Sequence, residues 1–200
     1  MADYPDWTAA VEALGYTEES FYVDTEDGWR IPLLHITGKV GEDAQDLDNS
    51  LGTVLVLHGS LMSATSFANK GAPTLPFQLA DEGFDVWLGS MRGTADSDCT
   101  PGSDCGLICN TEPITIYQED ADGNEVVGED GEPIVIETYD EESCSIDTVI
   151  SFAEKGSYDL PALVDGVLWK TEARRISLVG FSQGTSQSLY GVATNPNLES

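Results

Sequence analysis

The chain has 200 residues, which is enough for one domain with a sizeable core or for part of a larger domain. Its formal net charge of −28, from 36 acidic against 8 basic side chains, argues against nucleic acid as a partner, because neutralising phosphates requires Lys and Arg. The hydrophobic share of 40% is that of a globular protein, and no apolar run reaches the roughly 20 residues that span a bilayer.

The N-terminal part of the chain predicts a β-hairpin. The first residues, MADYPDWTAAVEALGY, lack the basic and apolar regions of a signal peptide, so we expect either a cytosolic protein or a signal outside these residues. The segment from Phe21 to Ile36 has the pattern of two strands around an Asp27-Gly28 turn. Residues 41–50, GEDAQDLDNS, are interpreted as an acidic linker.

The rest of the chain alternates between strands and helices. Residues 53–57, TVLVL, form a continuous aliphatic run, which is typical of a strand buried on both faces. The further predicted elements are a helix over 74–82, a strand over 84–88, a helix over 159–171 with Asp159 as N-cap, a strand over 176–179 and a helix over 183–193. This alternation predicts an α/β fold with a mostly parallel sheet.

Residues 95–150 interrupt the alternation and are interpreted as an acidic insertion that carries a β-ribbon. The stretch from Asp120 to Asn124 is superficially similar to a calcium-binding loop. Its sixth position is Glu125, where such loops need glycine, and its twelfth is Gly131, where they need glutamate. A solvated hairpin turn is therefore the favoured interpretation.

All four cysteines lie in this insertion, namely Cys99, Cys105, Cys109 and Cys144. An even number clustered in a loop-rich segment favours two disulfides and an oxidising compartment, although four cysteines allow three pairings. Zinc is disfavoured because the C-x5-C-x3-C spacing differs from the usual C-x2-C pairs and no histidine is near, while free thiols remain an alternative. We expect no metal ion and no cofactor.

The most informative stretch is ISLVGFSQGTSQSLYG, residues 176–191, which contains the pattern G-x-S-x-G around Ser182. A strand precedes it and a helix follows it, and in this context the pattern holds a nucleophilic serine on a sharp turn. Gly180 and Gly184 relieve crowding at such a turn. We therefore predict that Ser182 is a nucleophile and that the backbone N–H of Gln183 is one oxyanion donor.

A second oxyanion donor is expected from the loop after the strand over 53–57, which begins with His58-Gly59. His58 is interpreted as a residue that supports this loop and not as the catalytic base. The other histidine, His35, lies on the early hairpin. After Ser182 the sequence has no histidine and no aspartate, so a base for the serine is missing from residues 1–200.

Together, these segments resemble the N-terminal half of the acid lipase family, the α/β-hydrolases that include gastric and lysosomal acid lipases and related sterol esterases. Five segments carry the resemblance: GYTEESFYVDTEDGWRIPLLHI (15–36), VLVLHGSLMSATSF (54–67), LADEGFDVWLGSMRG (79–93), YDLPALVDGVLWKT (158–171) and SLVGFSQGTSQSLYGVATNP (177–196). It implies an α/β-hydrolase fold, truncated after the nucleophile strand and helix. It also implies Ser182 as the nucleophile and the N–H groups of Ser60 and Gln183 as the oxyanion hole.

The chain departs from the family pattern at three places. Phe181 stands where the family usually has histidine, and Ser60 stands where it usually has leucine. The usual Gly-Asn-Ser-Arg-Gly reads Gly89-Ser-Met-Arg-Gly93. These changes concern substrate preference more than the type of reaction.

The resemblance implies a serine ester hydrolase that acts on lipid esters, such as triacylglycerols or sterol esters, through an acyl-enzyme in a secreted or lysosome-like setting. Residues 1–200 would be the N-terminal part of one hydrolase domain, and a missing C-terminal half would supply the Asp and His of the triad. The alternative is a catalytically inactive α/β-hydrolase module that binds a lipid or a protein partner.

Overall fold

The computed structural model describes residues 7–42, 50–68, 72–118, 124, 126–128, 132–146 and 150–198. Most of the predicted linker over 41–50, most of the calcium-like stretch from Asp120 to Asn124, and Glu199 lie outside the described residues. The chain divides into two compact units, one formed by Met1–Cys105 with Ile150–Ser200 and the other by Gly106–Val149.

The larger unit begins with helix α1 (Trp7–Ala13), followed by strands β1 (Tyr16–Asp24) and β2 (Trp29–Lys39). The two strands pair antiparallel, so the hairpin predicted from Phe21 to Ile36 is confirmed and extends beyond both of its expected ends. Gly28 has a φ of 94°, a left-handed conformation that glycine adopts without steric cost, and it completes the turn between the strands.

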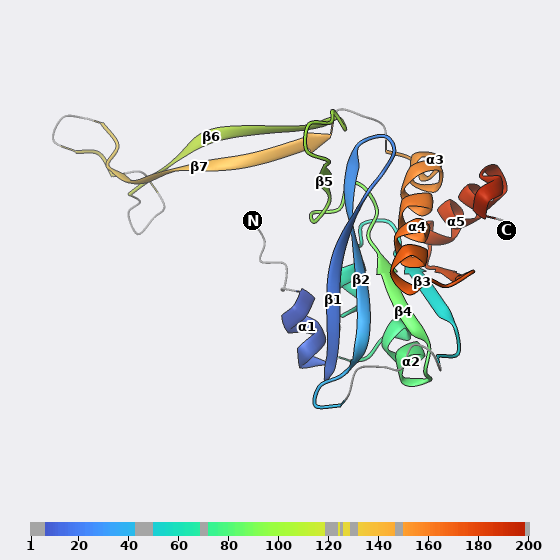
Figure 1. Ribbon diagram of the computed structural model, residues 1–200. Coiled ribbons are helices and arrows are strands. Elements are labelled where there is room, and N and C mark those ends of the chain that lie inside the picture. Colours follow the sequence, from blue (N-terminus) through green and yellow to red (C-terminus); the bar gives the residue numbers. More distant parts are fainter. Residues whose placement is uncertain are drawn as a thin grey trace. The chain divides into compact units, whose positions relative to one another are not determined.

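Three further strands extend this hairpin into a sheet. They are β3 (Thr53–Leu57), β4 (Asp85–Gly89) and β8 (Ser177–Gly180), and the order in the sheet is β1-β2-β4-β3-β8 (Figure 1). The sheet is mixed, because β3 pairs in parallel with β4 and β8, whereas β2 pairs antiparallel with β1 and β4. The short strand β5 (Asp98–Cys99) also pairs with β2.

Helices cover both faces of the sheet. On one face, Trp7 of α1 and Phe77 of α2 (Leu75–Asp81) join the core that includes Leu34, Val54 and Val86. On the other face, Leu163 of α4 (Leu160–Thr171) lies so close to Gly89 that a Cβ atom there would be 2.6 Å from Leu163 Cδ1. The unit is therefore a three-layer α/β/α arrangement, as the alternation of apolar strands and helices predicts.

The helix that contains α4 begins earlier than predicted. It starts with α3 (Phe152–Glu154) and continues through a π-helical segment, η3 (Lys155–Asp159), into α4. Ser151 is the N-cap, and its hydroxyl accepts a hydrogen bond from the backbone N–H of Ala153. The expectation that Asp159 is an N-cap is wrong, because Asp159 has helical dihedral angles and its side chain makes no capping bond.

The chain continues after β8 into helix α5 (Gln183–Thr194), close to the predicted helix over 183–193. Short 3-10 turns η2 (Ala64–Phe67) and η4 (Pro196–Leu198) complete the larger unit. No helix of the described part of the chain is long and apolar enough to cross a membrane.

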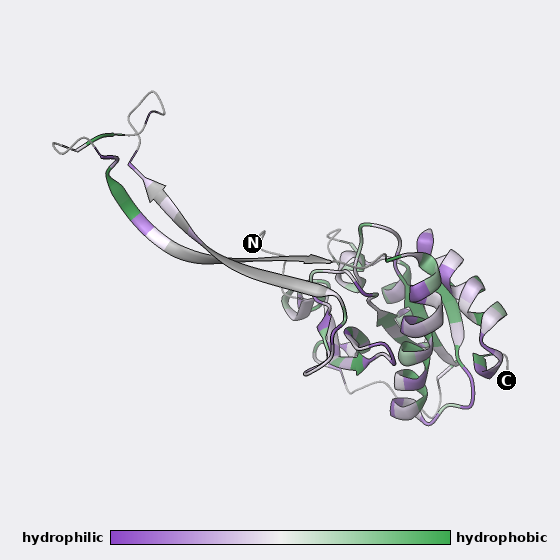
Figure 2. Cartoon of the chain, turned by 90° about the horizontal axis from the view of Figure 1, so that it is seen from above, coloured by the Kyte–Doolittle hydropathy of each residue, from purple (hydrophilic) through white to green (hydrophobic). Residues whose placement is uncertain are grey.

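The smaller unit is a two-stranded antiparallel ribbon of β6 (Leu107–Tyr117) and β7 (Val135–Ile146). Its sequence, Gly106–Val149, contains no Lys, Arg or His. Val135 and Ile136 nevertheless expose 51% and 64% of their surface, and Figure 2 shows this hydrophobic stretch in green at one end of β7.

Candidate active site

Ser182 lies on the sharp turn between β8 and α5. Its dihedral angles are φ 54° and ψ −117°, a left-handed conformation that is strained for any residue other than glycine. The preceding residue, Phe181, donates its backbone N–H to the carbonyl oxygen of Leu57 at 2.9 Å, which fixes the turn to the end of β3. The side chain of Ser182 is exposed, so its hydroxyl is accessible to a substrate.

The glycines of the G-x-S-x-G pattern are required by close backbone approaches. A Cβ atom at Gly180 would lie 2.5 Å from the backbone nitrogen of Thr185, and one at Gly184 would lie 2.6 Å from the carbonyl oxygen of Leu57. Both separations are shorter than real Cβ atoms show, so a larger residue would push α5 away from the strands. The two glycines thus hold Ser182 at the sheet edge.

His58 is held by backbone groups on both of its ring nitrogens. The N–H of Met91 donates to Nε2 at 3.1 Å, so Nε2 is unprotonated and Nδ1 donates to the carbonyl oxygen of Gly59 at 2.8 Å. Burial lowers the pKa of His58, which favours the neutral ring. With both nitrogens engaged, His58 supports the loop after β3 and is not free to take a proton from Ser182.

His35 is also engaged away from Ser182. It is 6% exposed, its Nε2 lies 2.8 Å from Oδ1 of Asp85, and its ring stacks on Trp87 with centroids 4.1 Å apart. His35 and His58 are the two histidines of the sequence, and both are engaged elsewhere. Residues 1–200 therefore offer Ser182 no histidine as a general base.

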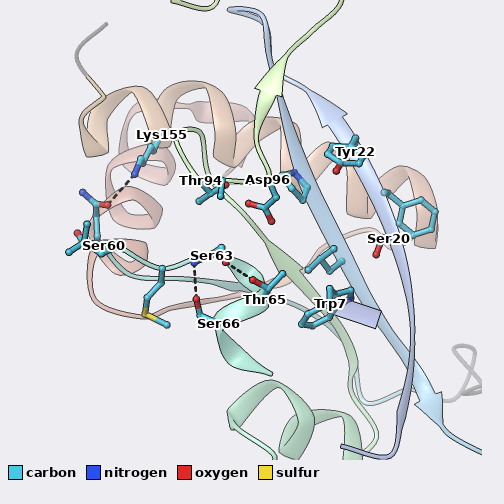
Figure 3. Close-up of a pocket in the computed structure, with 18 residues that line it drawn as sticks. Trp7, Ser20, Tyr22, Ser60, Ser63, Thr65, Ser66, Thr94, Asp96 and Lys155 are labelled. Atoms are coloured by element: carbon cyan, nitrogen blue, oxygen red, sulfur yellow. Dashed lines mark hydrogen bonds between the residues drawn. The ribbon is translucent and has the colours of Figure 1, made fainter. Parts of the chain in front are cut away.

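The two predicted oxyanion residues line one cavity. Gln183 is the first residue of α5, a position whose backbone N–H has no acceptor inside the helix. Ser60 follows Gly59 in the loop after β3, and the next residue, Leu61, has a φ of 58°. A cavity of about 1100 Å³ contacts both Ser60 and Gln183 (Figure 3).

The walls of this cavity combine apolar and polar groups. Hydrophobic side chains make up much of its lining, among them Trp7, Phe21, Tyr22, Leu34, Leu61 and Met62. Two charged residues, Asp96 and Lys155, line it as well. Among the described residues, Oδ1 of Asp96 is buried without a hydrogen-bond partner, and Lys155 donates from Nζ to Oε1 of Gln183 at 3.3 Å.

Sequence reasoning did not find these two charged residues. Lys155 lies in the π-helical segment η3, and Asp96 lies in the loop between β4 and β5. Neither belongs to a recognisable motif, so no local signal in the sequence indicates that they reach the same cavity.

A buried ion network fixes the loop that follows β4. Arg92 is 4% exposed and pairs with two carboxylates, Asp159 at 2.7 Å and Asp27 at 2.5 Å. Its backbone N–H also donates to Asp159 at 2.9 Å. These bonds tie the loop to the hairpin turn and to the start of α4, and guanidinium contacts with the rings of Trp29 and Tyr158 surround the charge.

The cysteines fall in both units. Cys99 and Cys105 form a disulfide in the larger unit. Cys109 and Cys144 are directly opposite each other in the register of β6 and β7, and a disulfide between them stays a prediction. Among the described residues no group of three or more His, Cys, Asp or Glu side chains could hold a metal ion.

Comparisons with known proteins agree with the motifs and the geometry. Residues 8–71 match the family described as "Partial alpha/beta-hydrolase lipase region". Sterol esterase 2 of Saccharomyces cerevisiae is 29% identical over 199 residues, covering 97% of this chain and 29% of the esterase. Gastric triacylglycerol lipase of Homo sapiens is 31% identical over 185 residues, covering 92% of this chain and 37% of the lipase. The chain thus spans about a third of the length of these relatives.

Solved structures support the fold. An esterase of Pyrococcus furiosus, Pf2001, matches with a TM-score of 0.52 and 16% identity, covering 96% of this chain and 51% of the esterase. The hypothetical protein PA2218 of Pseudomonas aeruginosa matches with a TM-score of 0.51 and 12% identity, covering 98% and 45% of the two chains. The fold is that of the α/β-hydrolases, and the resemblance to acid lipases is confirmed.

Proposed function

We propose that this chain, which resembles the N-terminal part of the acid lipases, carries the nucleophile of a serine hydrolase that acts on lipid esters. One observation carries the proposal most directly: Ser182 has a positive φ on the turn between strand β8 and helix α5, and the next residue, Gln183, lines a cavity with many apolar side chains. Strained residues that the surrounding backbone holds in place are typical of catalytic positions.

In the proposed reaction, the hydroxyl oxygen of Ser182 attacks the ester carbonyl carbon while a general base takes the serine proton. The backbone N–H groups of Ser60 and Gln183 donate to the oxygen that becomes negatively charged. The C–O bond to the alcohol breaks, the alcohol leaves with the proton, and the acyl group stays on Ser182. Water then attacks the acyl carbon while the base takes its proton, the bond between that carbon and the Ser182 oxygen breaks, the base returns the proton to Ser182, and a fatty acid is released.

The base is proposed to come from sequence beyond residue 200. The chain has two histidines, and both are engaged elsewhere. In α/β-hydrolases the acid and the histidine of the triad follow the nucleophile along the chain. The sheet supports further sequence after residue 200. Among the described strands β8 pairs with β3 alone, so one edge of β8 is open to a further strand, and its residues are partly exposed. Residues 1–200 would thus be the N-terminal part of one hydrolase domain, with 95–150 as an insertion within it.

The substrate class is proposed from the cavity and the relatives. Apolar walls suit an acyl chain, since burying each methylene contributes about 0.8 kcal/mol. The relatives are named as a sterol esterase and a triacylglycerol lipase, which favours neutral lipid esters. The disulfide between Cys99 and Cys105 supports an oxidising location, such as a secreted or lysosome-like one.

The alternative, a catalytically inactive module that binds a lipid or a protein partner, rests on the absence of an available histidine in residues 1–200. Hydrolysis separates the two possibilities. The full-length protein that contains residues 1–200 is assayed with nitrophenyl esters of short and long fatty acids, beside the variants Ser182→Ala and Ser186→Ala. Ser186 is an exposed residue of α5, the helix that follows Ser182, and serves as the control.

We expect hydrolysis by the natural protein and by Ser186→Ala, and a loss on the order of 10⁴ to 10⁶ in kcat for Ser182→Ala. Residues 1–200 alone should show trace activity at most. Full activity of Ser182→Ala would contradict the proposal, and a natural full-length protein that hydrolyses none of these esters would favour the binding module.

A further inference from the structure

Lys155 places a positive charge in the candidate active-site cavity of a strongly acidic protein. The chain has 8 basic residues against 36 acidic ones, and Lys155 lines the cavity together with Ser60 and Gln183. Its Nζ donates to Oε1 of Gln183 at 3.3 Å. The ammonium group therefore lies at the end of the cavity where the two proposed oxyanion donors are.

This ammonium group has no ion-pair partner among the described residues, where no carboxylate oxygen lies within 4.0 Å of its Nζ. The carboxylate of Asp159 acts on it from a distance but is itself bonded to Arg92. Lys155 is half-buried, and burial lowers its pKa. An unpaired, partly desolvated cation is stabilised by any anion that enters the cavity beside it.

The opposite end of the cavity is uncharged and partly aromatic. Figure 3 shows Lys155 and Ser60 on one side of the cavity and Trp7, Tyr22 and Ser20 on the other, with Asp96 between them. The carboxylate of Asp96 disfavours a second negative charge near the middle. The cavity thus presents a cationic end and an uncharged end with aromatic side chains, which fits a ligand with an anionic head group and a hydrocarbon tail.

We propose that Lys155 binds the carboxylate of a fatty acid in this cavity, with the hydrocarbon chain along the apolar side chains of its walls. The identity of this ligand rests on the proposed function, because a fatty acid is the second product of that reaction. The carboxylate accepts hydrogen bonds from the backbone N–H groups that hold the oxyanion, and Lys155 provides the balancing charge. Lys155 is then a specificity residue that retains the acid product.

Calorimetric titration tests this without relying on turnover. Decanoate and decan-1-ol, which share a chain length and differ in the charged head, are titrated into the full-length protein and into Lys155→Met and Lys155→Arg. A hydrogen bond between charged groups is worth roughly tenfold or more in affinity. We therefore expect Lys155→Met to weaken decanoate binding at least about tenfold, Lys155→Arg to retain most of it, and decan-1-ol to bind all three proteins alike.

A second measurement covers the case in which Lys155→Met does not fold. In the natural protein, decanoate should bind more tightly than decan-1-ol, although the net charge of −28 repels an anion. Decanoate affinity that is unchanged by Lys155→Met, no greater than that of decan-1-ol, or absent would overturn the inference. Ser182-dependent hydrolysis could still stand in that case. Conversely, if decanoate binding depends on Lys155 but the protein has no hydrolytic activity, the carboxylate site is supported and the proposed reaction is contradicted.

Discussion

A Cβ atom placed on Gly59 would lie 2.9 Å from the Cβ atom of Ser182. Real Cβ atoms essentially never approach so closely, so the loop after β3 reaches the turn after β8 because residue 59 has no side chain. This contact joins two segments that are far apart in the sequence. It accounts for how Ser60 and Gln183 come to line one cavity.

The close packing of the turn around Ser182 predicts a large effect of Gly180→Ala. Its new methyl group would meet the backbone of Thr185 and Gly184 at 2.5 to 2.6 Å, and backbone atoms cannot turn aside as a flexible side chain does. We expect the free energy of unfolding to fall by about 1–3 kcal/mol in urea titrations. The control Ser186→Ala, at an exposed position of α5, should change it by less than about 0.5 kcal/mol. Equal stability of both variants would show that the turn tolerates a side chain.

The ion network around Arg92 predicts a stability difference between two arginine variants. Arg92→Met leaves the buried carboxylate of Asp159 without its cation, which should cost about 3–5 kcal/mol. Arg30 pairs with Asp24, and these side chains are 39% and 44% exposed, so Arg30→Met should destabilise the fold far less than Arg92→Met. Thermal and urea unfolding of both variants measures the difference. Similar losses in the two would mean that burial does not govern the strength of these pairs.

The lowered pKa of Asp27 predicts how part of the free energy of unfolding depends on pH. Burial raises the pKa of Asp27, but hydrogen bonds from Arg92 and Thr25 and the charge of Arg92 together bring it below its ordinary value of 3.8. A lowered carboxyl pKa stabilises the fold above the unfolded pKa, and this contribution is lost as the pH falls through the folded pKa. The natural protein should therefore be more stable than Asp27→Asn near neutral pH, and the gap should close below pH 3.8. A stability difference between the natural protein and Asp27→Asn that grows on acidification would contradict this prediction.

The four cysteines predict that no free thiol remains in the oxidised protein. Cys99 and Cys105 are already bonded, and Cys109 faces Cys144 across the ribbon. Thiol titration under denaturation should find none in the natural protein and one in Cys109→Ser, because Cys144 then loses its partner. Two free thiols in the natural protein would leave the second disulfide unsupported.

Much of the fold could be predicted from local pattern. The aliphatic run of β3 marks a fully buried strand, and the glycines on either side of Ser182 mark a turn where backbone segments touch. Both signals lie in consecutive residues, so they are visible without knowledge of the tertiary structure. The predicted helix at residues 183–193 accordingly agrees with α5 to within a residue.

The features that escaped prediction depend on contacts between distant segments. The sequence predicts Asp159 as a helix N-cap, but in the structure its carboxylate accepts a hydrogen bond from Arg92, which lies in the loop after β4. Lys155 belongs to no motif in the sequence, and its position in the cavity follows from the helical segment that begins after the N-cap Ser151. Electrostatic partners of this kind leave no periodic pattern in the sequence.

The central claim, that Ser182 is a nucleophile activated by a base from beyond residue 200, is tested most directly by covalent labelling. A fluorophosphonate is incubated with the full-length protein, with Ser182→Ala and with residues 1–200 alone, and the modified residue is mapped by mass spectrometry. The account predicts one adduct on Ser182 of the full-length protein, none in Ser182→Ala, and labelling of residues 1–200 that is slower by about 10⁴ or more. An adduct on another serine, or equally fast labelling of Ser182 in residues 1–200 alone, would contradict it.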